Sequence, residues 1–94
     1  MKIGMMLGFE DSIKTITTIA QEAERSGIHS LYTVDAGRSA TITAAAVINA
    51  THRAKVGTYI VNAFAREPWM TALEARDLNE ISGGRFVLGV GTGN

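Results

Sequence analysis

The sequence contains no cysteine, and only one of its 94 residues is proline. Without thiols it can form neither disulfide bonds nor thiolate metal sites, and the reducing cytoplasm is its expected compartment. An excess of charge is also missing, because nine basic residues balance nine acidic ones. A neutral chain argues against a nucleic-acid partner, whose recognition normally requires a basic surface.

Long apolar runs are absent as well. The apolar N-terminal stretch 1–8 is too short for a signal peptide, and no segment approaches the roughly 20 residues of a membrane span. The two histidines, His29 and His52, have no further ligand at a suitable spacing, so no metal site is expected. Apolar residues nevertheless make up 46% of the chain, which indicates a folded domain rather than a disordered segment.

Strand-like and helix-like segments alternate along the chain. Short apolar and β-branched runs predict four buried strands, at residues 3–7, 30–34, 56–61 and 86–90. Between them, apolar residues recur every three or four positions, which is typical of one helix face. The first helix has a cap at Asp11 or Ser12, the second covers 41–50, and the third begins at Pro68 and ends at 82–84. The third helix is expected to bury a face made of Ala72, Leu73, Ala75, Leu78 and Ile81.

This β-α-β-α-β-α-β order implies parallel strands joined by right-handed crossovers. An open doubly wound sheet and a (β/α) barrel both have this pattern, and periodicity does not separate them. The sequence stops directly after the fourth predicted strand, with no helix to cover it. Half a barrel leaves two open sheet edges and an uncovered apolar face. We therefore expect residues 1–94 to form one partial domain that is truncated after strand four.

Candidate site residues follow the strands, because functional groups of parallel α/β proteins gather at the carboxyl ends of strands. Asp35 follows the second strand, Asn62 and Arg66 follow the third, and a glycine-rich run at 91–94 follows the fourth. Both histidines precede strands, which places them at the opposite end, where stability rather than catalysis is expected. The longer segment 89–94, GVGTGN, fails the dinucleotide pattern G-x-G-x-x-G, because Asn94 stands at the third glycine position.

Several of these residues have two readings. Asp35 either lines a pocket or caps a turn or helix, and Arg66 either binds a phosphate or is a solvated surface arginine. The glycines near the C-terminus either form a tight turn or let the backbone approach a ligand. Arg85 is expected to pair at the amino end of the fourth strand, and Trp69 is expected to pack.

Three segments carry a family resemblance. Residues 82–93, SGGRFVLGVGTG, resemble the LSGGRFxLGLGxG segment of the luciferase-like monooxygenases, a family that includes coenzyme F-420-dependent oxidoreductases. Residues 62–72, NAFAREPWMTA, look like the family's N-x-x-x-R-x-P-x-x-x-A stretch, and residues 50–58, ATHRAKVGT, are similar to its A-T-x-R-I-x-L-G-T. The resemblance covers the whole chain, with its motifs in the same order.

The resemblance implies a (β/α)8 TIM barrel, of which this chain supplies strands one to four. It further implies a flavin- or deazaflavin-dependent oxidoreductase or monooxygenase that uses FMN or coenzyme F-420 on a small-molecule substrate and is a homo-oligomer when complete. The isolated 94 residues are then expected to be inactive. Two alternatives stay open, namely a stand-alone half-barrel that assembles as a dimer and a truncated product without function.

The resemblance also implies which residues bind the cofactor. A non-proline cis peptide at Tyr59–Ile60, in a bulge on the third strand, would back the flavin ring, although Tyr59 departs from the small residue usual there. Asn62 would contact the cofactor beside that bulge, and Asp35 would line the end of the second strand. The rim after the fourth strand would consist of Gly91, Thr92 and Gly93. No side chain stands out as a general acid or base.

Overall fold

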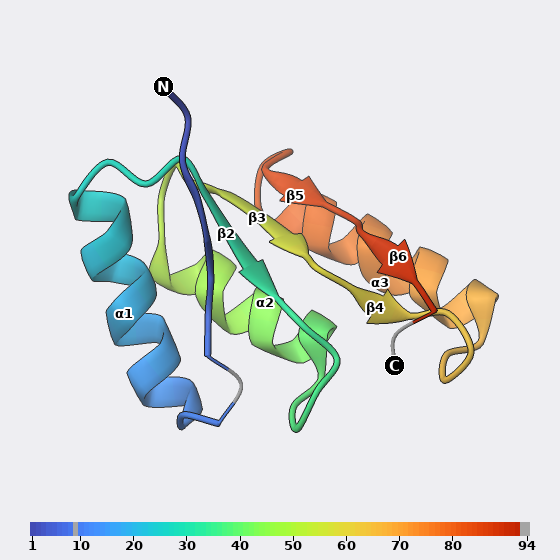
Figure 1. The fold of residues 1–94 in the computed structure, drawn as a ribbon. Coiled ribbons are helices and arrows are strands. Elements are labelled where there is room, and N and C mark those ends of the chain that lie inside the picture. Colours follow the sequence, from blue (N-terminus) through green and yellow to red (C-terminus); the bar gives the residue numbers. More distant parts are fainter. Residues whose placement is uncertain (9, 93–94) are drawn as a thin grey trace.

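The computed structural model describes residues 1–8 and 10–92, which form a layer of parallel strands with three helices against it (Figure 1). The predicted alternation of strands and helices is confirmed, and two of the predicted strands are divided. In chain order the elements are β1 (Gly4–Met6), α1 (Ile13–Arg25), β2 (Ser30–Thr33), α2 (Ala40–Ala50), β3 (Lys55–Thr58), β4 (Val61–Asn62), α3 (Pro68–Ile81), β5 (Phe86–Val87) and β6 (Val90–Gly91).

The strands follow one another across the sheet in the order in which they occur in the chain. All pairings are parallel, the main sheet has the order β1-β2-β3-β5, and a second ladder pairs β4 with β6. Because the order never reverses, right-handed crossovers place every helix on the same face, as Figure 1 shows. A doubly wound sheet reverses its order and carries helices on both faces. The described residues therefore have barrel topology, which resolves the alternative that periodicity left open.

The predicted third and fourth strands are each interrupted, and the interruptions lie side by side. Residues 56–61 are divided between β3 and β4 by Tyr59 and Ile60, and residues 86–90 between β5 and β6. At the second break the Thr58 hydroxyl accepts from the Gly89 backbone N–H and donates to the Gly89 carbonyl, both at 2.9 Å. The Thr58 hydroxyl thus takes the place of a backbone group of a neighbouring strand. The pattern of apolar residues does not predict such a replacement.

Helix starts follow the expected capping chemistry. The Ser12 hydroxyl accepts the N–H of the third residue of α1, and Ser39 caps α2 in the same way, one residue earlier than predicted. Helix α3 begins at Pro68 as predicted, and the Glu67 carboxylate accepts the N–H of Trp69. Gly27, with φ near 92°, follows α1 in the left-handed conformation that glycine adopts without strain.

The core lies between the helices and the sheet. Its fully buried side chains come from α1, β2, α2 and β3, and the largest of them are Ile16, Leu31, Val47 and Val56. Helix α3 contributes one buried residue, Leu78, whereas Ala72 and Ile81 are exposed and Trp69 is 67% exposed. The predicted packing of Trp69 is therefore wrong for the described residues. The predicted α3 face is confirmed at Leu78, is half-buried at Leu73 and Ala75, and is wrong at Ala72 and Ile81. Helix α3 packs mainly on α2 and the short β5, so part of its apolar face is left uncovered by the described residues.

At the amino ends of the strands, Glu24 and Arg85 bind main-chain groups of the connecting segments. The buried Glu24 carboxylate accepts the backbone N–H groups of His52, Arg53 and Ala54 at 2.7–3.0 Å. Burial alone would raise the pKa of Glu24, but these N–H donors outweigh burial and the net shift is downward. Arg85 donates to main-chain carbonyls that include those of Ile48 and Ala54, which confirms its predicted place.

The face of the sheet away from the helices has no covering element among residues 1–8 and 10–92. Tyr32 lies on this face, because the neighbouring Leu31 points into the core. A Cβ on Gly57 would meet the Tyr32 ring and the Val87 carbonyl, so glycine is required there for close packing. Within the same described residues, no helix is long and apolar enough to cross a membrane.

Candidate functional site

A hollow of about 680 Å³ lies at the carboxyl end of the sheet. Its walls come from the segment after β2, the β3–β4 segment and the end of β6, and the lining residues are Val34, Asp35, Ala36, Tyr59, Ile60, Asn62, Gly91 and Thr92. Six predicted cofactor residues, Asp35, Tyr59, Ile60, Asn62, Gly91 and Thr92, are thus brought together, while Gly93 lies outside the described residues. The volume is that of a typical small-molecule site, roughly 300–1,000 Å³.

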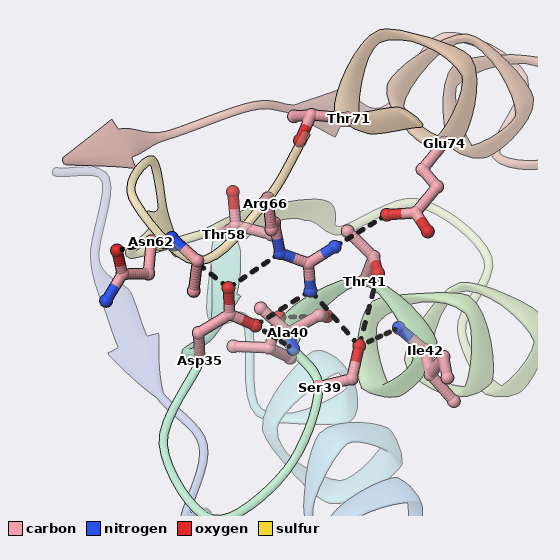
Figure 2. A network of polar contacts seen from close by, with 12 residues as sticks. Asp35, Ser39, Ala40, Thr41, Ile42, Thr58, Asn62, Arg66, Thr71 and Glu74 are labelled. Atoms are coloured by element: carbon pink, nitrogen blue, oxygen red, sulfur yellow. Dashed lines mark hydrogen bonds and ion pairs between the residues drawn. The ribbon is translucent and has the colours of Figure 1, made fainter. Parts of the chain in front are cut away.

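Asp35 connects two walls of this hollow through a carboxylate with four hydrogen-bond donors (Figure 2). Its Oδ1 accepts the Ala40 N–H at 2.8 Å, and its Oδ2 accepts the Asn62 N–H at 2.9 Å. Arg66 donates to both oxygens, from Nε at 2.7 Å and from Nη2 at 2.8 Å. Asp35 therefore has both predicted roles, since it lines the hollow and binds the first N–H of α2.

The electrostatics of this carboxylate follow from its partners. The hydrogen bonds from the Arg66 guanidinium, and after them those from the N–H groups of Ala40 and Asn62, lower the pKa of Asp35 to about 2 against the opposing effect of burial. In return, the hydrogen bond to Asp35 raises the pKa of Arg66. Asp35 is consequently ionised throughout the neutral range and has no tendency to take up a proton there.

Arg66 is neither a solvated surface residue nor a free anion receptor, so both predicted readings of it are wrong. Its side chain is only 17% exposed, and its third nitrogen, Nη1, donates to Glu74 Oε1 at 2.7 Å. A further contact at 3.2 Å joins Nη2 to the Ser39 hydroxyl. Every nitrogen of the guanidinium thus donates to a protein group, so Arg66 has no free pair of N–H groups for bidentate binding of a phosphate.

Glu74 and Glu24 are the residues that sequence reasoning missed. Each lies on the inward face of its helix, four residues from a buried apolar residue: Glu74 precedes Leu78 and Glu24 follows Ala20. A carboxylate on a buried stripe requires a cation or several N–H donors, because an unpaired buried charge is very costly. That position was the available signal, and it indicates that a partner exists without indicating which one.

Asn62 presents different atoms to the protein and to the hollow. Its Oδ1 accepts the N–H groups of Phe64 and Ala65 at 2.9 and 3.2 Å, which forms a tight Asx turn. Its Nδ2 has no hydrogen-bond partner among the described residues, and Figure 2 shows the side chain directed away from the Asp35–Arg66 pair. Because Asn62 lines the hollow, its amide is a candidate donor to a ligand there.

The Tyr59–Ile60 peptide is cis, as the family resemblance implied. Backbone hydrogen bonds tie it to the end of β2, from Tyr59 N to the Thr33 carbonyl at 2.6 Å and from Asp35 N to the Ile60 carbonyl at 3.1 Å. The Tyr59 side chain is 65% exposed, and its ring meets Tyr32 edge to face with centroids 6.2 Å apart. Tyr59 thus contributes an accessible aromatic wall.

The glycine-rich run acts through packing, which neither predicted reading anticipated. A Cβ on Gly89 would overlap the Thr58 carbonyl, and a Cβ on Gly91 would overlap the end of the Ile60 side chain. Glycine at these positions lets the last strand approach the Tyr59–Ile60 segment closely. Ile60 and Gly91 can therefore share one wall of the hollow.

The lining residues define what the hollow can bind. Val34, Tyr59 and Ile60 offer apolar and aromatic surface, and Asn62 offers amide donors, which together suit a flat ring with a polar edge. None of the lining residues is a cation, so these residues offer no charge partner to a phosphate. No three histidine, aspartate or glutamate residues within 1–8 and 10–92 cluster as a metal site would require.

Known proteins resemble this chain over its whole length. The family model described as luciferase-like monooxygenase matches residues 1–94. The 5,10-methylenetetrahydromethanopterin reductase of Methanolobus tindarius is 32% identical over 95 residues, which cover 99% of this chain and 29% of the relative.

Solved structures give the same picture. The coenzyme F-420-dependent tetrahydromethanopterin reductase of Methanopyrus kandleri has a TM-score of 0.93 at 28% identity, over 99% of this chain and 27% of that one. The oxygenating constituent of 3,6-diketocamphane monooxygenase of Pseudomonas putida, solved with FMN, has a TM-score of 0.83 over 100% of this chain and 30% of that one. At 20% identity this second likeness concerns the fold alone. The chain thus spans less than a third of the length of these relatives.

Proposed function

The chain belongs to the luciferase-like monooxygenase family, and on this premise we propose that it is the ring-binding part of a flavin- or deazaflavin-dependent oxidoreductase. One observation carries the proposal: residues from three separate segments, which the family resemblance implies as cofactor contacts, line a single hollow. The similar reductase from Methanopyrus kandleri uses coenzyme F-420, and the similar monooxygenase was solved with FMN. The cofactor is accordingly FMN or coenzyme F-420, and the substrate is a small molecule.

The residues present suit the ring of such a cofactor. Tyr59 and Ile60 form an apolar wall, Gly91 packs against Ile60 in that wall without a side chain of its own, and the Asn62 amide donates to a polar ring edge. When bound, the cofactor supplies the redox chemistry, and the protein supplies binding, orientation and electrostatics. The cofactor's phosphate is held elsewhere, because Arg66 is fully engaged by Asp35 and Glu74.

Proton transfer is not a task of Asp35. Its pKa near 2 and its four hydrogen-bond donors leave it no basicity to use at neutral pH, where a general base requires a pKa close to the working pH. The contribution of Asp35 is to fix the walls of the hollow. The described residues therefore act by placing the ring and by covering one of its sides.

We also propose that the 94 residues alone do not turn over a substrate. Their hollow is open on one side, and its lining offers a phosphate no cation. Cytoplasmic location and homo-oligomeric assembly of the full-length enzyme remain predictions from the sequence.

A nuclear magnetic resonance titration tests ring binding directly. We expect FMN or coenzyme F-420 to shift the amide resonances of Tyr59, Asn62 and Gly91 and to leave those around Glu24 unchanged. Asn62→Asp keeps the oxygen that forms the turn and replaces the amide donor, so it should weaken binding by up to about 10-fold, the value of one hydrogen bond. A chimera with residues 1–94 in place of the matching segment of the Methanolobus reductase should bind coenzyme F-420. If neither the chain nor the chimera binds either cofactor, the proposal is wrong.

A second candidate is a stand-alone half-barrel that pairs with another copy of itself. It is favoured by the outer edges of β1 and β5, which have no strand partner among the described residues, and by the exposed side chains of Met6 and Val87. Light scattering should then give twice the monomer mass. A monomeric mass would remove this candidate, and aggregation on expression would instead support a truncated product without function.

A further inference from the structure

Two walls of the hollow are joined through the Asp35 carboxylate. Asp35 and Asn62 come from different strand ends, and the Asn62 N–H bonds to Asp35 Oδ2 at 2.9 Å. The other carboxylate oxygen of Asp35 accepts the Ala40 N–H, at the first residue of α2. The orientation of one carboxylate therefore sets how Asn62 is placed relative to the segment after β2.

Arg66 fixes that orientation although it does not line the hollow. Its Nε and Nη2 atoms grip both oxygens of Asp35, a bidentate arrangement that defines the plane of the carboxylate. Arg66 is itself held on its far side by Glu74, from the interior of α3. Figure 2 shows the guanidinium between these two carboxylates, so a continuous chain of charge-assisted bonds links α3 to Asn62.

We infer that Arg66 is a positioning residue of the hollow, which acts through Asp35 on Asn62 and is anchored by Glu74. The identity of the ligand in this inference rests on the proposed function, whereas the contact chain does not. Lysine cannot replace Arg66, because a single ammonium group lacks the planar fork that reaches both Asp35 oxygens and Glu74 together. The competing view is that the cluster only stabilises the fold.

Matched variants separate these two roles. Arg66→Lys and Arg66→Met break the chain of contacts at its centre, and Glu74→Gln weakens its anchor. Arg85→Lys is the control, because Arg85 is also an arginine with several protein partners but lies at the opposite end of the sheet. A purely structural role would make the Arg66 and Arg85 variants alike in every measurement.

The first measurement is the FMN affinity of the 94-residue chain, corrected for the folded fraction. We expect about 10-fold weaker binding for both Arg66 variants, the low end of what the loss of a supporting hydrogen bond costs at metal sites. The effect of Glu74→Gln should be smaller, and Arg85→Lys should bind like the unmodified chain. Equal affinity of the Arg66 and Arg85 variants would overturn the inference.

The second measurement requires no ligand and therefore remains decisive if the unmodified chain binds neither FMN nor coenzyme F-420, a result that would count against the proposed function. In the free chain we expect the amide resonances of Asn62 and Ile60 to shift in Arg66→Lys and to stay in place in Arg85→Lys. The pH midpoint reported by the Asn62 amide should rise in Arg66→Met. If the Asn62 resonances are unchanged in both Arg66 variants, Arg66 does not position the hollow.

Discussion

Each end of the sheet has one carboxylate and one arginine with several hydrogen-bond partners, but the kinds of partner differ. At the amino end, Glu24 and Arg85 do not bind each other, because Glu24 accepts main-chain N–H groups and Arg85 donates mainly to main-chain carbonyls. At the carboxyl end, Asp35 and Arg66 bind each other, and each also reaches a further group. The first arrangement ties loops down, while the second connects separate elements through side chains.

This difference matches what the two ends of a parallel α/β protein do. Main-chain partners are present whatever the side chains are, so a charge that satisfies them contributes mainly to stability. A side-chain ion pair can fix the position of one element relative to another. Here the pair of Asp35 and Arg66 fixes the position of Asn62, which lines the hollow. The residues at the amino end are therefore expected to affect unfolding alone, and those at the carboxyl end both unfolding and binding.

The largest effect is expected for Arg66→Met, which leaves Asp35 and Glu74 without their common cation. Removal of one partner of a largely buried pair typically costs about 3–5 kcal/mol, and the partial exposure of Asp35 and Arg66 places this variant near the lower value. Urea unfolding measures the loss. The double variant with Asp35→Asn should recover part of it, and a loss below about 1 kcal/mol would show that the pair is solvated.

A somewhat smaller loss is expected for Glu24→Gln at the amino end. The glutamine oxygen can replace Oε2 and accept from Arg53 and Ala54, but its NH2 then faces the His52 N–H and the negative charge that strengthens all these bonds is lost, which together costs about 2 kcal/mol. Urea unfolding should detect this loss, while the resonances of the hollow should not move. A shift at Asn62 in this variant would contradict the separation of the two ends.

The pH dependence of stability also distinguishes the two ends of the sheet. The folded-state pKa of Asp35, about 2, lies below its ordinary 3.8, so its contribution is fully present above pH 3.8 and is lost as the pH falls through 2. The difference corresponds to about 2 kcal/mol. Glu24 shifts in the same direction, so the unmodified chain must be compared with Asp35→Asn. Between pH 5 and pH 2 the stability of Asp35→Asn should fall less steeply, and parallel curves would remove Asp35 as the cause.

The smallest effect is expected for Glu74→Gln. Its side chain is 36% exposed, about twice the exposure of Arg66, so water screens this part of the cluster. We expect a loss below about 1 kcal/mol in thermal or urea unfolding. A larger loss than that of Glu24→Gln would mean that the anchor on α3 matters more than the main-chain cap at the amino end.

Much of the fold could be predicted because its signals are local. The strand and helix order, the cap at Ser12 and the start at Pro68 follow from neighbouring residues, and the carboxyl-end rule gathered Asp35 and Asn62 into one site. The bulge that divides the third strand at Tyr59–Ile60 was implied by the family resemblance. The division of the fourth strand was missed, because it depends on a hydroxyl group that bonds to a residue 31 positions away.

Partners and burial were harder to predict for the same reason. Arg66 shows no sequence sign of its pairing with Asp35, because the two are brought together only when β2 and β4 are in place. The apolar residues of α3 follow the helical period, but burial requires a neighbouring element. Among the described residues such a neighbour buries Leu78 and leaves most of the other apolar side chains of α3 at least partly exposed. Periodicity identifies which face of a helix is apolar and does not identify what covers it.

Thr58 has a consequence for which substitutions its site can accept. Its hydroxyl carries one hydrogen and two lone pairs, and Gly89 uses the hydrogen and one lone pair. Serine retains both capacities, whereas valine, which matches threonine in shape, has neither and would leave the Gly89 N–H without its acceptor. A swap that looks conservative by volume would thus remove the junction at which the sheet steps from β5 to β6, and with it one wall of the hollow.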